Sequence, residues 1–301
     1  MEDELKLIHW NINGRSGYSS AYAIPPFITN EIIDGVGKGA GVIVLTEFVI
    51  TAGWHHLVSA LERFYFVATS PYVSKQNGVL IAVRKDLIQE KSIPRVTSDL
   101  ITTQNEKPNF LQVEFVCRGV NLTIIGTRVR VGSALKADYQ DRKTQIVALR
   151  EHLGRVSVST DNVIVVGDFN NSRICGDERK SYDEVREEYH FRNDGGVSDL
   201  YDTYNYHILK QTLDCLTPVY TTPSKEDFSW VDSNRYRYKQ DHLFIKGMQA
   251  ETCVYDWAFV TKENGYGQLS KWGYKSNLAG YPDHAVLSAI VRVTKSDTHD
   301  S

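Results

Sequence analysis

The chain has 301 residues, of which 42% are hydrophobic and 24% are charged, and its formal net charge of −3 gives a pI near 6.3. This composition is typical of a globular protein with a sizeable core, and the acidic balance excludes the strongly basic footprint of tight, non-specific nucleic-acid binding, though not a local basic groove. No apolar run reaches the roughly 18 residues of a membrane span, and the acidic N-terminus, Met1 to Glu4, predicts no secretory signal.

The predicted elements of the first part of the chain are short apolar strands that alternate with helices. Strands are predicted at Leu5–Trp10, Gly41–Thr46, Tyr65–Thr69 and Val79–Val83, and helices at Pro25–Val36 and Trp54–Phe64. The first strand ends in the turn Asn13-Gly14, and Lys75 to Gly78 is predicted to turn the chain between the last two strands.

A hairpin and the best helix of the chain come next. Phe110–Cys117 and Val120–Thr127 are two strand-like runs joined by Arg118-Gly119, which is typical of a β-hairpin. Helical spacing of apolar residues predicts a helix at Ala137–Leu153, closed by Gly154. Another buried strand is predicted at 163–166.

The remaining residues contain a polar stretch and three late strands. Helix-like pieces are predicted at Tyr182–Tyr189 and Leu200–His207, and strands at Phe228–Val231, His242–Ile245 and Val286–Val291. No linker interrupts the pattern, so residues 1–301 are predicted to form one domain with a core from about residue 5 to 293. Helices interleaved with this many strands predict an α/β fold, a layered sandwich of two packed β-sheets with helices outside.

Four cysteines are scattered widely along the chain, at Cys117, Cys175, Cys215 and Cys253. They include no CxxC pair, so a metal cluster or a dense disulfide framework is not predicted. Reduced thiols in a cytoplasmic protein are the expected state.

Polar residues stand repeatedly where the predicted strands stop or start, which is where α/β sheets gather their ligands. After strands these residues are Asn11, Glu47, Arg128, Arg130, Asp168 and Asn170, and before the late strands they are Asp241, His242, Asp283 and His284. In an antiparallel arrangement, the start of one strand lies beside the end of another. We therefore expect these groups to share one edge of the sandwich.

Glu47 and Asn11 are candidate ligands of a hard cation. Mg²⁺ prefers oxygen and is typically held by one or two carboxylates together with substrate phosphate. The neutral amide oxygen of Asn11 can join such a shell without adding repulsion. Alternatively, Glu47 is a strand-end surface carboxylate, and Asn11 belongs to an ordinary turn.

The string Gly167-Asp168-Phe169-Asn170 is the most specific chemical signal in the sequence. Gly167 is expected to let the backbone turn sharply, so that Asp168 faces the strand end and can orient and deprotonate a water molecule. Asn170 can donate to a phosphoryl oxygen where charge develops. The alternative is a simple Asx turn that ends the strand.

Two acid–imidazole pairs, Asp283-His284 and Asp241-His242, precede the late strands. A protonated His284 can bond a phosphate oxygen, and a nearby carboxylate would raise its pKa and fix its tautomer. Adjacency does not decide whether Asp283 faces His284 or a metal ion. Each pair could also be a solvated strand start.

Taken in order, five strings resemble motifs of the endonuclease/exonuclease/phosphatase superfamily, which has the DNase I-like fold. The strings are Trp10-Asn11-Ile12-Asn13-Gly14, Leu45-Thr46-Glu47, Gly167-Asp168-Phe169-Asn170, Gln240-Asp241-His242-Leu243 and Pro282-Asp283-His284. The resemblance covers nearly the whole chain. It implies a four-layer sandwich in which helices flank the two packed sheets.

The resemblance also implies a divalent-metal-dependent phosphoesterase. Glu47 would be the principal ligand of Mg²⁺ or Mn²⁺, with Asn11 beside it. Asp168 would position and activate the attacking water, and Asn170 would contact the phosphate.

The resemblance assigns the remaining acid–imidazole groups to the phosphoryl transition state. His284 would stabilise that state, backed by Asp283, which is also a candidate metal ligand. Asp241 would support the site near the metal or His284. The reaction would be an in-line attack of water on phosphorus, driven by positioning and charge stabilisation.

One strand departs from the family's pattern. Many members carry a His or Tyr on the central strand before the long helix, whereas this chain has Thr127-Arg128-Val129-Arg130 there. Arginine is a good bidentate phosphate ligand, so Arg128 or Arg130 is a candidate to hold the substrate, and alternation predicts that both project from one face. A pair of solvated arginines is the other interpretation.

Three functions stay open. The first is a nuclease or related phosphodiesterase, favoured by the aromatic and basic residues of segment 234–239, which suit stacking and phosphate contact but equally suit an exposed hairpin strand. The second is a phosphatase or hydrolase of small phosphorylated molecules. The third is a non-catalytic binding module on the same fold.

Overall fold

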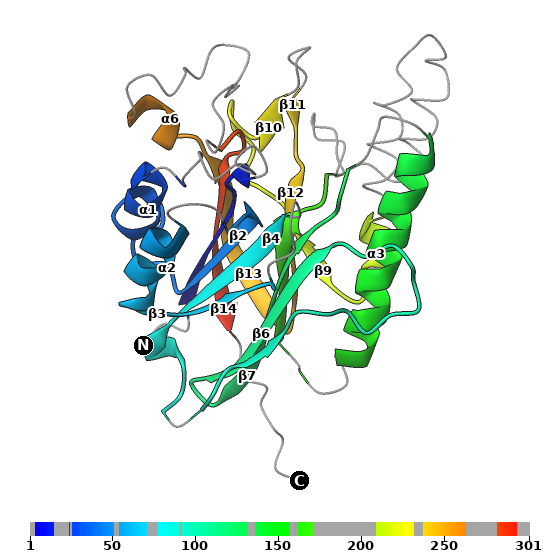
Figure 1. The fold of residues 1–301 in the computed structure, drawn as a ribbon, viewed down its shortest axis with the longest axis horizontal. Coiled ribbons are helices and arrows are strands. Elements are labelled where there is room, and N and C mark those ends of the chain that lie inside the picture. The colour runs from blue at the N-terminus through cyan, green and yellow to red at the C-terminus, as the bar shows by residue number, and fades with distance from the viewer. Residues whose placement is uncertain are drawn as a thin grey trace.

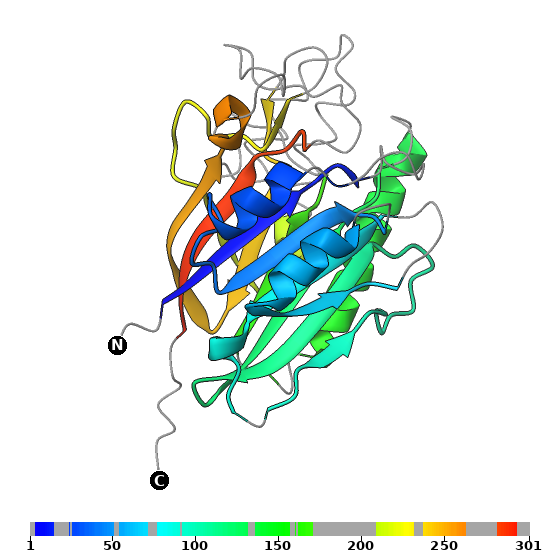
Figure 2. The same cartoon turned by 60° about the vertical axis from the view of Figure 1, so that its left-hand side comes forward.

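The fold is seen in a computed structural model, which describes residues 4–14, 24, 26–50, 54–71, 77–90, 92–131, 136–156, 160, 162–170, 209–231, 237–262 and 282–293. Two six-stranded sheets lie at its centre, and helices cover the outer face of each sheet (Figures 1 and 2). This arrangement confirms the predicted α/β sandwich of two packed sheets flanked by helices. None of the described helices is long and apolar enough to cross a membrane.

The first sheet contains both ends of the described chain. Its strands, in spatial order, are β13 (Met248–Asp256), β14 (Val286–Val293), β1 (Glu4–Asn11), β2 (Val42–Phe48), β4 (Gly78–Arg84) and β3 (Tyr65–Thr69). Only the neighbours β1 and β2 run parallel, and the other neighbours pair antiparallel. Helices α1 (Pro26–Ile33) and α2 (Trp54–Glu62) lie on the outside of this sheet (Figure 1).

The second sheet has the same mixed character. Its strands, in spatial order, are β5 (Arg95–Thr97), β6 (Asn109–Cys117), β7 (Val120–Arg128), β8 (Asn162–Asp168), β12 (Asp241–Lys246) and β9 (Thr217–Val219). Strands β7 and β8 form its parallel pair. Helix α3 (Lys136–Val156) covers its outer face, and a two-stranded ribbon of β10 (Trp230–Val231) and β11 (Arg237–Tyr238) stands apart from both sheets.

Strand β8 shows how the sequence divides the core into layers. Ile164 and Val166 belong to the large buried cluster between the sheets, whereas Val163 and Val165 pack with the apolar stripe of α3. Successive side chains of a strand point to opposite faces, so a strand with apolar residues throughout must be covered on both sides. The continuous apolar run at 163–166 therefore predicts a central strand.

The two parallel pairs direct their carboxyl ends to one edge of the sandwich. Asn11, the last residue of β1, lies opposite Thr46 of β2. In the second sheet, Arg128 lies opposite Asp168, and Asp168 lies opposite Asp241 on the antiparallel strand β12. The backbone register thus brings together residues that are far apart in the sequence.

Two predicted elements differ from the structure, and one strand of the first sheet was not predicted. Helix α3 continues through Gly154 to Val156, so the prediction that this glycine closes the helix was wrong. The strand predicted at Phe228–Val231 is reduced to the two residues of β10. Strand β13 was missed, because most of its side chains are exposed or half-buried and it carries little apolar periodicity. The first half of the predicted turn at Lys75 to Gly78 lies outside the described residues, as do all of 182–189 and 200–207.

Gly167 has a different role from the predicted one. It lies inside β8, and a side chain there would overlap the backbone carbonyl oxygen of Thr127 on the neighbouring strand. The left-handed backbone belongs instead to Asn170, whose φ is 49°. Gly167 therefore permits the close pairing of β7 and β8 that sets Arg128 beside Asp168.

Replacing Gly167 with alanine is expected to lower the free energy of unfolding by at least about 2 kcal/mol, because the overlap is with backbone that cannot move aside cheaply. Gly154→Ala is the matched control, since a side chain there meets no heavy atom within 4 Å. That helical substitution should stabilise the chain by up to about 1 kcal/mol. Urea unfolding of both variants measures the difference, and equal stability of Gly167→Ala and the parent would contradict the packing argument.

Candidate active site

Polar side chains from both sheets converge at the edge where the parallel strands end. Asn11, Arg128 and Asp168 are the last residues of β1, β7 and β8, and Asp241 is the first residue of β12. All four side chains are buried. Burial of this many polar groups is costly unless they satisfy one another or a ligand, which marks this edge as the candidate active site.

Asp168 is almost completely buried and accepts three hydrogen bonds. Asn11 Nδ2 donates to its Oδ2 at 2.9 Å, and Asn170 donates through its backbone N–H to Oδ1 at 2.9 Å and through Nδ2 to Oδ2 at 3.1 Å. Burial nevertheless raises the pKa of Asp168 to about 6, assisted by the neighbouring negative charges and opposed by His284 and Arg128. A fixed carboxylate with a pKa near neutrality is well suited to accept a proton from water.

Asn170 orients Asp168 in this structure. Its backbone is left-handed, a conformation that asparagine tolerates better than most residues. Besides Asp168, its Nδ2 donates to the carbonyl oxygen of Val129 at 2.8 Å, and its own carbonyl oxygen accepts from Arg142 Nη1 at 2.7 Å. Both amide hydrogens therefore have protein acceptors, so contact of Asn170 with a phosphate stays a prediction.

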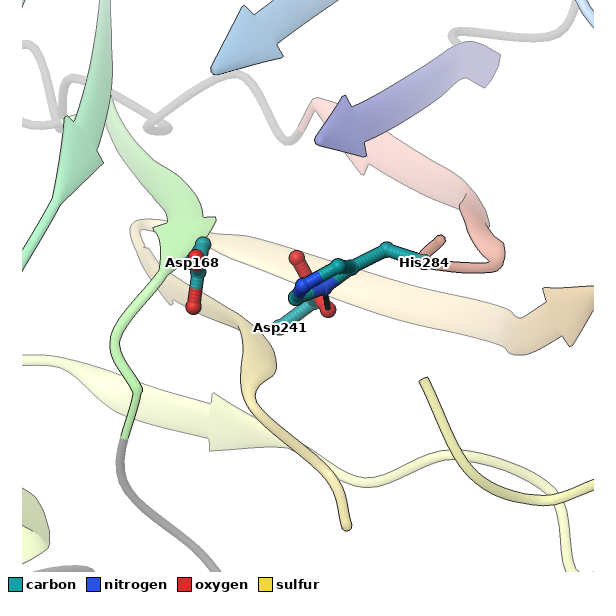
Figure 3. Close-up of side chains that lie close together, drawn as sticks. All are labelled: Asp168, Asp241 and His284. Carbon is teal, nitrogen blue, oxygen red and sulfur yellow. Dashed lines mark hydrogen bonds and ion pairs between the residues drawn. The ribbon is translucent and has the colours of Figure 1, made fainter. Parts of the chain in front are cut away.

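Asp241 and His284 form a buried pair beside Asp168 (Figure 3). His284 Nδ1 donates to Asp241 Oδ2 at 2.8 Å, and Trp10 Nε1 donates to the carbonyl oxygen of His284 at 3.0 Å, which fixes the backbone ahead of β14. Burial opposes the charged form of His284, but the Asp241 carboxylate, with help from Asp168 and Asp283, raises the pKa of His284 to about 10. His284 is therefore a cation at neutral pH.

The same pairing acts on the carboxylate. Burial alone would raise the pKa of Asp241, but the charge of His284 and its hydrogen bond outweigh burial and lower that pKa below its usual range. Asp241 thus stays ionised next to a protonated imidazole. Asp168, on the other side of this pair, has the raised pKa, so the two acids are electrostatically distinct.

His9 is a member of the site that sequence reasoning missed. It is fully buried on β1, with Nε2 3.1 Å from Thr46 Oγ1 and Nδ1 3.4 Å from Asp241 Oδ1. Burial lowers the pKa of His9 to about 4, so it is neutral at physiological pH and its contact with Asp241 is not an ion pair. A histidine inside an apolar strand resembles an ordinary core residue, and only the position two residues before Asn11 could have singled it out.

Glu47 reaches the site through an irregularity in the first sheet. The register of β2 and β4 shifts between Thr46 and Phe48, which leaves Glu47 as the extra residue of a bulge with a φ of 51°. Bulges redirect side chains next to functional sites, and a left-handed non-glycine residue is a strained one. The Glu47 carboxylate is buried, with Oε1 2.6 Å from Arg128 Nη2.

Two candidate residues lie outside this cluster. Alternation placed Arg128 and Arg130 on one face, but Arg130 follows the end of β7, and its half-exposed guanidinium pairs with Glu106 at 2.8 Å. Asp283 is half-buried, and its Oδ2 accepts from Trp230 Nε1 at 3.4 Å. The structure therefore gives Asp241, not Asp283, the direct bond to His284.

The basic residues of segment 237–239 are used within the protein. The Arg237 guanidinium lies 4.7 Å from the centre of the Phe228 ring, and Lys239 is buried with its Nζ 2.8 Å from Asp227 Oδ2. These contacts do not favour the nucleic-acid role that was one interpretation of residues 234–239. Residues 234–236 lie outside the described part of the chain.

The donor groups at this edge fit a hard cation. Asp168, Asp241 and His284 each place one potential ligand atom within 4.8 Å of the others. Of these, protonated His284 would repel a cation, whereas Asp241 Oδ1 is buried and receives no hydrogen bond from the described residues. With the carboxylate of Glu47 and the amide oxygen of Asn11 nearby in the site, the cluster offers the oxygen ligands that Mg²⁺ prefers.

Several solved structures have the same architecture as this chain. A 3′-5′ exonuclease from Neisseria meningitidis superposes with a TM-score of 0.61 at 17% identity, covering 95% of this chain and 98% of the exonuclease. An AP endonuclease from Archaeoglobus fulgidus gives 0.55 at 16% identity, with coverages of 95% and 98%. An endonuclease/exonuclease/phosphatase family protein from Bacteroides thetaiotaomicron gives 0.58 at 11% identity, with coverages of 98% and 100%.

Sequence comparison adds no closer likeness. No protein-family model matches the chain, and no curated protein matches it. At identities this low, the structural likeness establishes the fold and leaves the activity to be argued from the site. The chain therefore has the DNase I-like fold that these three solved structures share.

Proposed function

We propose that the chain is a divalent-metal-dependent hydrolase that cleaves phosphodiester bonds in nucleic acid. The observation that carries the proposal is the placement of the Asp168 carboxylate, with its pKa near 6, beside His284, which Asp241 keeps protonated. Asp168 is suited to take a proton from the attacking water, and His284 is suited to place positive charge or a proton on the phosphoryl group. Removal of a proton from water and stabilisation of charge at the phosphoryl group both accelerate hydrolysis of a phosphate ester.

The other buried residues of the site would prepare these two groups. Asn11 and Asn170 hold the Asp168 carboxylate in one orientation, and Asp241 holds His284. Glu47, with Asn11 Oδ1 as a neutral partner, would hold Mg²⁺ or Mn²⁺. When bound, the divalent cation would supply Lewis-acid stabilisation of the charge that develops on phosphorus-bound oxygens.

Nucleic acid is the substrate class that the structural neighbours favour. One neighbour is a 3′-5′ exonuclease and another is an AP endonuclease, and the Neisseria enzyme has also been solved as a 3′ phosphatase bound to a product DNA hairpin. A small phosphorylated molecule would use the same reacting groups. We therefore treat that substrate class as an alternative outcome of the experiment.

The test is a substrate panel with the purified full chain. Plasmid DNA, single-stranded DNA, RNA, a 3′-phosphorylated DNA hairpin and simple phosphomonoesters are each incubated with Mg²⁺ or Mn²⁺, with and without EDTA. We expect cleavage of a nucleic acid that EDTA abolishes and that Glu47→Gln lowers by about a hundredfold, because that substitution removes the anionic metal ligand.

The other outcomes of this panel separate the remaining functions. Turnover of phosphomonoesters alone would assign the site to small phosphorylated molecules. No turnover of any substrate in either metal would favour a non-catalytic binding module and would overturn the proposal.

We also infer a cytoplasmic location from the cysteines. Two cysteines within the described residues, Cys215 and Cys253, are free thiols. Free thiols are typical of a reducing compartment.

A further inference from the structure

The Arg128 guanidinium bridges two carboxylates of the candidate active site. Its Nη2 lies 2.6 Å from Glu47 Oε1, and its Nε lies 3.5 Å from Asp168 Oδ2. The side chains of all three residues are at most 7% exposed, so little water screens these charges. Arg128 therefore neutralises the acid proposed to bind the metal and touches the acid proposed to activate water.

The Arg128 guanidinium and a divalent cation compete for the charge of the Glu47 carboxylate and for its Oε1. Mg²⁺ needs direct oxygen contacts at about 2.1 Å in near-octahedral geometry. The buried guanidinium 2.6 Å from Glu47 Oε1 occupies space that such a cation would need. Its positive charge would also repel the cation. A cation that takes Oε1, or both carboxylate oxygens, can therefore bind only if Arg128 moves away from Glu47.

We propose that Arg128 is a displaceable internal counter-ion that couples metal binding to phosphate binding, an inference that rests on the proposed function. In the metal-free protein, the guanidinium neutralises Glu47. A divalent cation at Glu47 displaces it, and the released guanidinium then binds a phosphate oxygen of the substrate, for which its planar fork is well suited. Metal alone is thus held weakly, and metal together with phosphate is held tightly.

The position of Arg128 at the end of β7 supports this exchange. Its backbone lies opposite Asp168, so a long side chain that leaves Glu47 stays within the same cluster. Arg130, two residues later, has its guanidinium on exposed Glu106 and cannot serve in the same way without leaving that pair. Of the two arginines, Arg128 is therefore the one placed to contact the phosphate.

The first experiment measures metal binding rather than turnover. Isothermal titration of the full chain with Mn²⁺ or Mg²⁺ should show that Arg128→Gln binds the cation about tenfold more tightly than the parent, within the usual range of coupling between two ligands. Arg128→Lys, which keeps the charge but loses the fork, should lie between them. Arg150→Gln is the control, because it removes one arginine from an exposed pair with Asp214 and should change the metal affinity less than twofold.

The second experiment measures the coupling with inorganic phosphate as the probe. In the parent, saturating Mg²⁺ should strengthen phosphate binding about tenfold, and in Arg128→Gln this gain should shrink to about threefold or less, because the guanidinium is gone. Circular dichroism checks that each variant is folded. Arg128→Gln would overturn the inference if, while folded, it bound the metal no more tightly than the parent, or if the coupling to phosphate were unchanged.

These outcomes separate the inference from the proposed function. If EDTA abolishes turnover but the metal affinity of Arg128→Gln is unchanged, the proposed hydrolase function stands and the counter-ion role of Arg128 is wrong. If Arg128→Gln binds the metal more tightly but no substrate is turned over, the counter-ion role of Arg128 stands and the proposed hydrolase function is wrong. Undetectable metal binding in both proteins would overturn the counter-ion as well.

Discussion

Asparagine in place of Asp168 is expected to lower the rate of metal-dependent phosphodiester hydrolysis by about a thousandfold, within the range attributed to a positioned proton acceptor. The substitution keeps the shape of the side chain and removes the group that takes the proton from water. The backbone N–H of Asn170, which now donates to Asp168 Oδ1 at 2.9 Å, can donate to the amide oxygen instead. The site should therefore keep its geometry and lose its base.

The fold is expected to tolerate this change. Burial raises the pKa of Asp168, so the ionised carboxylate is already unfavourable in the folded state at neutral pH, and a neutral amide removes that penalty. Against this, the new amide group must face the donors Asn11 Nδ2 and Asn170 Nδ2, which costs about 1–3 kcal/mol for an unmatched buried group. The two effects oppose each other, so the unfolding temperature should shift by only a few degrees.

The measurement is kcat/KM on the nucleic acid identified by the substrate panel, at saturating Mg²⁺. Asp214→Asn is the matched control, because the same chemical change falls on an exposed carboxylate that pairs with Arg150. The control should keep its activity within twofold. A folded Asp168→Asn protein that retained the parent's activity would remove Asp168 from the mechanism.

The positions of many site residues were predictable from the sequence of each strand taken alone. Apolar runs that stop at Asn11, Glu47 and Asp168 indicate strand ends, and strand ends of α/β sheets share an edge. The fold class followed from the alternation of strands and helices. These are local signals, because each depends on residues within about ten positions of one another.

The contacts between the site residues were not predictable in the same way. Glu47 and Arg128 lie on different sheets, and their ion pair depends on the β2 bulge and on the packing of one sheet against the other. Sequence spacing therefore left Arg128 and Arg130 equivalent. The structure separates them because β7 ends at Arg128 and the chain then turns toward α3.

The partner of His284 was also beyond sequence reasoning. Asp283 is adjacent to His284 in the sequence, whereas Asp241 starts β12 of the second sheet and meets His284 only across the edge of the sandwich. Asp283 instead accepts a hydrogen bond from Trp230 Nε1, so adjacency in the sequence did not identify the partner. The same reasoning explains why His9 was missed, since its relation to Asp241 exists only between strands.

The pH dependence of the reaction follows from the raised pKa values of Asp168, which must be ionised, and of His284, which must be protonated. Activity needs ionised Asp168, so the rate should rise as pH passes about 6. It also needs protonated His284, so the rate should fall only as pH approaches about 10. The expected profile is a broad plateau between these limits, and its limbs belong to the coupled site as a whole.

Asp241→Asn is expected to move the alkaline limb of this profile to lower pH and to lower the rate at pH 8 by about a hundredfold. The Asp241 carboxylate is the main group that raises the pKa of His284 against burial, so without its charge the buried imidazole loses its proton more readily.

Asp283→Asn provides a graded comparison for this prediction. Asp283 contributes less than Asp241 to the raised pKa of His284 and makes its hydrogen bond with Trp230. The alkaline limb of the Asp283→Asn rate profile should therefore move less than that of Asp241→Asn. Asp241→Asn combined with His284→Ala should be no slower than His284→Ala alone, since the two residues act as one unit. Rate profiles from pH 5 to 10.5 and the NMR titration of the His284 ring measure these shifts. An unmoved alkaline limb in folded Asp241→Asn would mean that the charge of His284 does not come from Asp241, and the pair could not be the source of positive charge at the phosphoryl group.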